Sequence, residues 1–169
     1  MLDNQTFLIT GIADENSLAM KVAQEILSYN GKVVCTGLGV TPFHTNLSEK
    51  ATNFLTKSYA DFEEACKKNL GNDVLLFPLD VTLPENLHSF ANELLTRNIK
   101  LSGFLHAIAM DKTIRQKSVK PMLEVTAEEF NDTMTVSAFS LISLSHALLQ
   151  NGVLQNGSSI VSLSYIAAE

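Results

Sequence analysis

A short apolar run that begins at Phe7 stops at Gly11 and is followed by a small polar loop and an amphipathic segment. The first N–H groups of a helix have no partner within the helix and carry partial positive charge, so a strand, a glycine turn and a helix in this order form a natural anion site. The pattern therefore makes a dinucleotide site one interpretation. The full G-x-G-x-x-G fingerprint is absent, since Ala13 and Ser17 stand at later positions, and an ordinary strand-to-helix connection is the other interpretation.

Apolar runs and segments of helical period alternate to the end of the chain, which is typical of repeated strand-helix-strand units. The expected strands are residues 5–10, 32–36, 73–78, 101–108 and 158–164, and the expected helices are residues 17–28, 83–97 and 126–150. Residues 39–72 form a longer insert, which we expect to contain two helices broken near Ser58. This pattern predicts an α/β fold with a doubly wound parallel sheet, Rossmann-like and truncated after the fifth strand, in one domain over residues 1–169.

Helix boundaries have their own signals. Asn30 and Gly31 are suited to the left-handed residue that ends a helix, and Gly152 marks the end of the last one. The segments Thr82–Glu85 and Thr126–Glu129 both match the capping box, in which a hydroxyl and a carboxylate satisfy the N-terminal donors of a helix.

The composition limits the classes of partner. Twelve basic and 18 acidic residues give a net charge of −6, which argues against a nucleic-acid surface. We expect no membrane association, because no apolar run is long enough to span a bilayer. Cys35 and Cys66 lie outside any metal or redox spacing, so we expect two buried thiols and a cytoplasmic protein. His44, His88 and His146 have no acidic partners at ligand spacing, and we expect no metal site.

Four patches in order resemble the short-chain dehydrogenase/reductases, and within them the NADH-dependent enoyl-acyl-carrier-protein reductases. They are Thr10–Ala13 with Ser17–Ala19, then Leu79–Val81, then Gly103–Ala109, and finally Ser162–Glu169 with its Leu-Ser-Tyr sequence. The resemblance implies NADH as cofactor and the trans-2-enoyl thioester of acyl carrier protein as substrate in fatty-acid elongation. It also implies a homo-oligomer in which long helices pair between subunits.

The resemblance assigns roles to seven residues. It implies that Gly11, Ser17 and Leu18 form the turn and helix start beneath the pyrophosphate. Asp80 and Val81 would contact the adenine, with a simple turn cap as the alternative role of Asp80. Ile108 would pack against the ribose and nicotinamide, whereas the buried His106 is expected to have no catalytic role.

Tyr165 matches a family tyrosine beside the nicotinamide, whose phenol could donate to the enolate oxygen that develops when hydride adds. A tyrosine that only packs at a strand end is the alternative. The family's Tyr-x6-Lys pair would follow later, whereas this sequence stops at Glu169, so we expect no enoyl reduction by this chain alone. The same stop predicts an exposed apolar edge at residues 159–163 and a tendency to self-associate.

The sequence departs from the pattern of this family at further positions, and these leave alternatives open. Leu38 cannot hydrogen-bond adenine as a polar side chain would, and Ala109 stands where a glycine is expected. The basic loop 110–125, with Lys112, Arg115, Lys117 and Lys120, could meet the acidic carrier protein or be a solvated surface. A short-chain reductase of other substrate preference and a non-catalytic nucleotide-binding module are the alternative functions.

Overall fold

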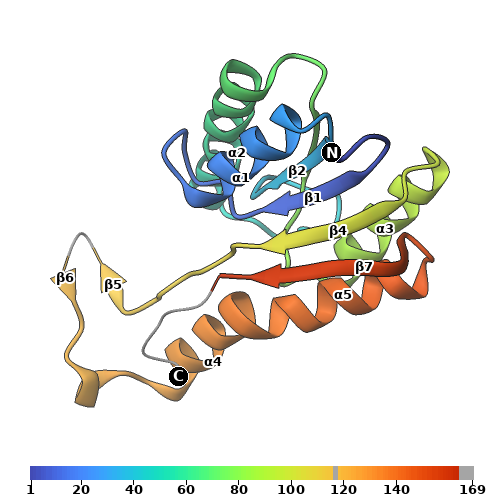
Figure 1. Cartoon of the computed structure of the whole chain (residues 1–169). Helices are drawn as coiled ribbons and strands as arrows, with labels where there is room; N and C mark the ends of the chain where they lie inside the picture. The colour runs from blue at the N-terminus through green and yellow to red at the C-terminus, as the bar shows by residue number, and fades with distance from the viewer. Residues whose placement is uncertain (116–117, 164–169) are drawn as a thin grey trace.

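The computed structural model describes residues 1–115 and 118–163, which form a parallel sheet with helices on both faces (Figure 1). Five strands lie in the order β3-β2-β1-β4-β7, and all four pairings between neighbours are parallel. The strands are β1 (Thr6–Thr10), β2 (Lys32–Gly37), β3 (Leu75–Pro78), β4 (Leu101–His106) and β7 (Leu154–Ser162). The expected doubly wound parallel sheet is confirmed.

Four helical elements cover the sheet, two on each face. Helices α1 (Leu18–Ser28) and α2 (Glu49–Leu70) lie on one face, and α3 (Pro84–Thr96) and α5 (Ser140–Gln150) lie on the other (Figure 1). Each face has its own apolar cluster, so alternate side chains of β1 enter different clusters: Leu8 joins the α3 and α5 side, and Ile9 the α1 and α2 side. Burial on both faces explains the apolar centres of the inner strands, such as Leu8 and Ile9 of β1 and Val33–Cys35 of β2.

A small excursion links β4 to α5. It contains the two-stranded hairpin β5 (Ile114–Arg115) and β6 (Ser118–Val119), the short 3-10 helix η1 (Met122–Glu124) and helix α4 (Ala127–Met134). The expected single helix over 126–150 is instead α4 and α5 joined by the π-helical turn η2 (Thr135–Phe139). The capping box at Thr126 is confirmed, because its hydroxyl accepts from the Glu129 N–H and the Glu129 carboxylate accepts from the Thr126 N–H.

Two helix predictions are wrong. Helix α2 runs unbroken through Ser58, because Leu55, Phe62 and Cys66 all turn toward the sheet and no helix-breaking residue interrupts them. The second is the capping box at Thr82: helix α3 begins one residue later with Leu83 as N-cap and no side-chain cap. Helix α1 ends as predicted, with Asn30 at φ +63°.

Among the strands of the described residues, β7 lies at one edge of the sheet. Its neighbour is β4, and Ile160 and Val161 are 45% and 53% exposed. The two strands approach closely at Gly103, where a Cβ atom would lie 2.5 Å from the Ser159 carbonyl oxygen. In the described part of the chain, no helix combines the length and the apolar character that a bilayer crossing requires.

Candidate functional site

A pocket of about 500 Å³ opens at the carboxyl ends of β1, β2, β3 and β4. Parallel α/β sheets bind ligands at this end of their strands. The lining combines the segments after these strands with single residues from α2 and η2: Gly11, Ile12, Ala13, Thr36, Gly37, Leu38, Phe54, Leu79, Asp80, Val81, Thr82, Ala107, Ile108, Ala109, Met110 and Val136. Most of this surface is apolar, and among these described lining residues Asp80 is the single ionisable one.

Gly11 follows β1 and lies against the backbone that follows β4. Its φ is +78°, and a Cβ atom there would lie 2.1 Å from the Ala107 carbonyl oxygen and 2.8 Å from the Ile108 nitrogen. The adjacent Thr10 joins the same two strands, since its hydroxyl donates to the Leu105 carbonyl at 2.9 Å and accepts from the Ala107 N–H at 3.3 Å. Only glycine fits this turn, which brings the Gly11 and Ile108 backbones together.

Asp80 is held from several directions after β3. Its N–H donates to the buried Asn86 side chain at 2.8 Å. Its carboxylate Oδ1 accepts from the Thr82 N–H at 2.9 Å and from the Thr82 hydroxyl at 2.6 Å, while Oδ2 lies 3.2 Å from His44 Nε2. Thr82 therefore donates its hydrogen bonds to Asp80 and does not cap α3. Asp80 does form the local turn considered in its alternative role, and it also lines the pocket.

Ser17 and Leu18 do not line this pocket. The Ser17 hydroxyl is the N-cap of α1, accepting from the Met20 N–H at 3.2 Å and donating to the Asp14 carbonyl at 2.9 Å. Leu18 is 68% exposed at the first position of the helix. Both residues thus mark where α1 begins after the glycine turn. Tyr165 lies outside the described residues.

Four of the seven predicted site residues therefore meet in one pocket: Gly11, Asp80, Val81 and Ile108. Sequence reasoning missed Phe54, which lines the pocket from α2 while 62% exposed, and Val136 from the π-helical turn. It also missed the contact of His44 with Asp80, so the expectation of no acidic partner is wrong for His44. These two residues are 36 positions apart, and no local spacing signals their contact.

The basic loop is partly neutralised. Lys112 pairs with Asp132, and Lys120 pairs with Glu129 at 2.8 Å. The Lys120 ammonium, followed by the Thr126 N–H, lowers the pKa of Glu129 to about 2. Lys117 lies outside the described residues. At least two of the four cations of this loop, which could meet a carrier protein or be solvated, are therefore engaged within the chain.

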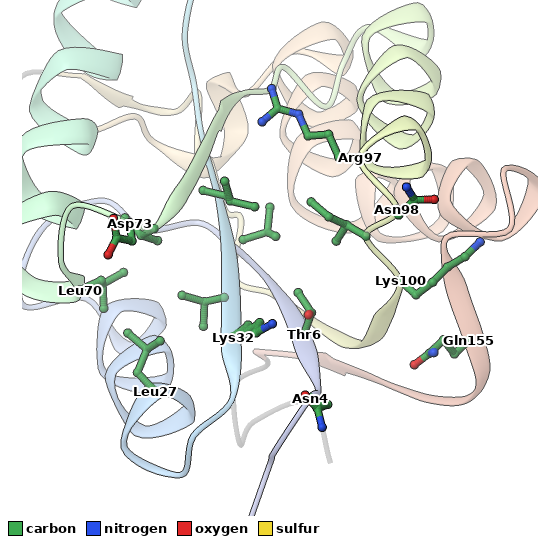
Figure 2. Close-up of a pocket in the computed structure, with 15 residues that line it drawn as sticks. Asn4, Thr6, Leu27, Lys32, Leu70, Asp73, Arg97, Asn98, Lys100 and Gln155 are labelled. Atoms are coloured by element: carbon green, nitrogen blue, oxygen red, sulfur yellow. The ribbon is translucent and has the colours of Figure 1, made fainter.

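A larger hollow, of about 680 Å³, lies at the opposite end of the sheet (Figure 2). Its lining includes Thr6, Lys32 and Lys100, which stand at the amino ends of the strands or just before them, together with Asp73 and Arg97. Strand starts do not gather the loops that form ligand sites in this kind of sheet. The smaller pocket at the carboxyl ends is therefore the candidate site.

His106 and the two cysteines are buried, as expected. Ser140 donates its hydroxyl to the Val136 carbonyl at 2.6 Å and so accepts from His106 Nε2 at 2.7 Å. Cys35 and Cys66 are buried free thiols; their mutual hydrogen bond, followed by burial, raises the pKa of Cys35. Among the described residues, no group of three His, Cys, Asp or Glu side chains gathers in a way that could hold a metal ion.

Burial of His106 should make stability depend on pH. Desolvation lowers the pKa of His106 below its usual 6.5, so below about pH 6.5 the unfolded chain binds a proton that the folded chain does not. The free energy of unfolding is therefore expected to fall as the pH falls below about 6.5, toward the lowered pKa of the folded chain. Urea unfolding of the wild type and His106→Gln between about pH 5 and pH 8 measures this effect. The free energy of unfolding of His106→Gln should change less steeply with pH than that of the wild type. The exposed His88→Gln is the control and should keep the wild-type slope. Equal slopes for the wild type and His106→Gln would contradict the prediction.

Comparison with known proteins gives one family. The model of the family described as Enoyl-(Acyl carrier protein) reductase matches residues 11–169. The enoyl-acyl-carrier-protein reductase (NADH) of Aquifex aeolicus is 27% identical over 169 residues, which are 100% of this chain and 55% of that protein. The corresponding protein of Haemophilus influenzae is 26% identical over 168 residues, 99% of this chain and 56% of its own length.

Solved structures agree with the sequence comparison. The crystal structure of the Aquifex aeolicus protein has a TM-score of 0.76 and 27% identity, covering 99% of this chain and 58% of that one. The FabI–NADH complex of Alistipes finegoldii has a TM-score of 0.77 at 22% identity, covering 99% of this chain and 53% of that one, which is a likeness of fold. The chain spans about 56% of the length of the curated relatives it matches.

Proposed function

Because the chain belongs to the enoyl-(acyl carrier protein) reductase family, as the sequence patches indicate, we propose that it forms the NADH-binding part of an enoyl reductase. The whole enzyme would transfer a hydride from NADH to the trans-2-enoyl thioester of acyl carrier protein in fatty-acid elongation. The observation that carries the proposal is the meeting of Gly11, Asp80, Val81 and Ile108 in one pocket at the carboxyl ends of the strands. Residues 1–169 would act as one dinucleotide-binding domain, supported by two apolar clusters on the faces of one sheet.

The pocket's lining suits NADH. Gly11 lets the backbone of Ala107 and Ile108 approach the turn after β1, so that both backbone segments line the pocket. Asp80 offers a carboxylate to the amino group of adenine, and Val81 and Leu38 offer apolar surface to the ring. No arginine or lysine is among the described lining residues, and a 2′-phosphate would need such a cation. These features favour NADH over its phosphorylated form.

The remaining site residues have roles that follow from their places. We propose that Ser17 and Leu18 act through the backbone at the start of α1, where the first N–H groups of a helix favour a pyrophosphate. Ile108 would pack against the nicotinamide ribose. Tyr165 would be the catalytic donor to the developing enolate oxygen. When bound, NADH supplies the hydride, and these residues hold and orient it.

The whole protein would take the carrier-protein thioester as partner and would work in the cytoplasm, a location supported by two buried free thiols. It would also form a homo-oligomer. Support for this last proposal comes from the exposed apolar side chains of α4, η2 and α5, among them Phe130, Phe139 and Ile142.

A titration of NADH fluorescence with the chain tests the cofactor site. We expect saturable binding that Asp80→Ala weakens by about tenfold, because a hydrogen bond to a charged group contributes about 1.5 kcal/mol or more. Asp73→Ala is the matched control, since Asp73 belongs to the hollow at the other end of the sheet (Figure 2). Absence of NADH binding, or equal losses in the two variants, would contradict the proposal. NADH oxidation with a crotonyl thioester should show no turnover by this chain alone.

A further inference from the structure

The loop between β2 and α2 reaches across to Asp80 through one side chain, His44. Nε2 of His44 lies 3.2 Å from Oδ2 of Asp80, and the two side chains are only 8% and 16% exposed. The loop is closed just before this contact, because the His44 N–H donates to the Thr41 carbonyl at 3.2 Å. Thr41 is itself buried, so His44 projects from an anchored turn.

The hydrogen bonds of His44 assign its proton. The Thr41 N–H lies 3.0 Å from Nδ1 of His44, and a backbone N–H can only donate. Nδ1 is therefore the acceptor, and the proton of the neutral ring is on Nε2, facing the Asp80 carboxylate. His44 is thus a donor aimed at one oxygen of the pocket's ionisable side chain, from a position outside the pocket lining.

Two anchors fix the plane of the Asp80 carboxylate. Thr82 holds Oδ1 with two donors, and His44 holds Oδ2 with one. A carboxylate oxygen accepts about two hydrogen bonds, so Oδ2 retains capacity for one further donor. With Thr82 alone, the carboxylate could turn about its Oδ1 contacts and lose its direction relative to the pocket.

We propose that His44 is a positioning residue that orients Asp80 to recognise the exocyclic amino group of the adenine base. This inference rests on the proposed binding of NADH in the pocket. A carboxylate oxygen attracts an amino group and repels a carbonyl oxygen, so an oriented Asp80 distinguishes adenine from hypoxanthine, in which a carbonyl replaces the amino group. The neighbouring Leu38 has no polar group for the base, which leaves this discrimination to Asp80.

The test compares binding of NADH with binding of nicotinamide hypoxanthine dinucleotide, reduced form, by fluorescence titration. His44→Leu keeps an apolar side chain of moderate size without a donor, and His44→Gln restores an N–H donor. We expect the wild-type preference for NADH to fall by about tenfold in His44→Leu and to recover largely in His44→Gln. The exposed His88→Leu is the control and should keep the wild-type ratio.

The ratio of the affinities for the two dinucleotides distinguishes a positioning role of His44 from a general structural role. Equal losses of affinity for both dinucleotides in His44→Leu, with the ratio unchanged, would overturn the inference and leave the proposed function standing. A ratio that stays low in His44→Gln would also overturn it. If the wild type binds neither dinucleotide, the proposed function fails and the inference with it. Should His44→Leu not fold by circular dichroism, His44→Ala is the second donor-free variant.

Discussion

Replacing Gly11 with alanine is expected to lower the free energy of unfolding by about 2 to 5 kcal/mol and to abolish NADH binding. Two physical costs combine at this position. A left-handed φ of +78° costs a side-chain-bearing residue about 1 to 2 kcal/mol. The new Cβ would also meet the Ala107 carbonyl oxygen at 2.1 Å, so the backbone after β1 or β4 must shift, at about 1 to 3 kcal/mol.

The chain offers one control for each cost. Gly152 has a φ of +63° with nothing within 4 Å of its Cβ position, so Gly152→Ala isolates the backbone cost. Gly103 has a close contact, 2.5 Å from the Ser159 carbonyl oxygen, without a positive φ, so Gly103→Ala isolates the steric cost. In urea unfolding of the three variants, Gly11→Ala should have the lowest free energy of unfolding. A Gly11→Ala variant as stable as Gly152→Ala would show that the close approach to Ala107 does not exist.

Loss of NADH binding in Gly11→Ala has a separate cause, because the displaced backbone lies in the pocket. Gly103→Ala provides the comparison, since its strain falls between β4 and β7, away from the lining residues. We expect Gly103→Ala to bind NADH with an affinity close to that of the wild type wherever it remains folded. Fluorescence titration at a temperature below the unfolding transition distinguishes the two effects.

Much of the fold was predictable because burial on both faces of a sheet leaves a simple trace in the sequence. Residues 5–10 and 101–108 are rich in apolar side chains, and they contain β1 and β4, which pair near the centre of the sheet. The errors arise where tertiary contacts override local signals. Ser58 looks like a break, yet the face formed by Phe62 and its neighbours packs on the sheet and keeps α2 whole. Thr82 matches a capping box, yet its hydroxyl donates to Asp80.

The site was predictable for a related reason. Gly11, Asp80 and Ile108 each follow a strand, and the carboxyl ends of parallel strands meet at one edge, so their convergence follows from topology. His44 and Phe54 could not be found in this way. His44 lies in the loop before α2, and Phe54 lies in α2 itself. Their positions depend on how α2 packs on the sheet, and local sequence spacing carries no signal of that packing.

The apolar face of α4, η2 and α5 is expected to make the chain self-associate. Its side chains are about half exposed or more: Phe130 59%, Met134 44%, Phe139 57%, Ile142 62% and Leu149 58%. Ile142 and Leu149 are seven residues apart and so lie on one face of α5. Contiguous exposed apolar side chains mark sites of protein–protein contact. Sedimentation at micromolar concentration should therefore show a dimer or larger species.

Charge on this face should dissociate the assembly. The double variant Phe139→Glu with Ile142→Glu is expected to sediment as a monomer, because two carboxylates would have to be buried without partners. Tyr29→Glu, at the exposed end of α1, is the control and should keep the wild-type state. The edge strand β7 offers a competing interface, which Val161→Lys would block by placing a charge on an exposed edge. If Val161→Lys dissociates the assembly and the double variant Phe139→Glu with Ile142→Glu does not, self-association occurs through the sheet edge and the helical interface is refuted.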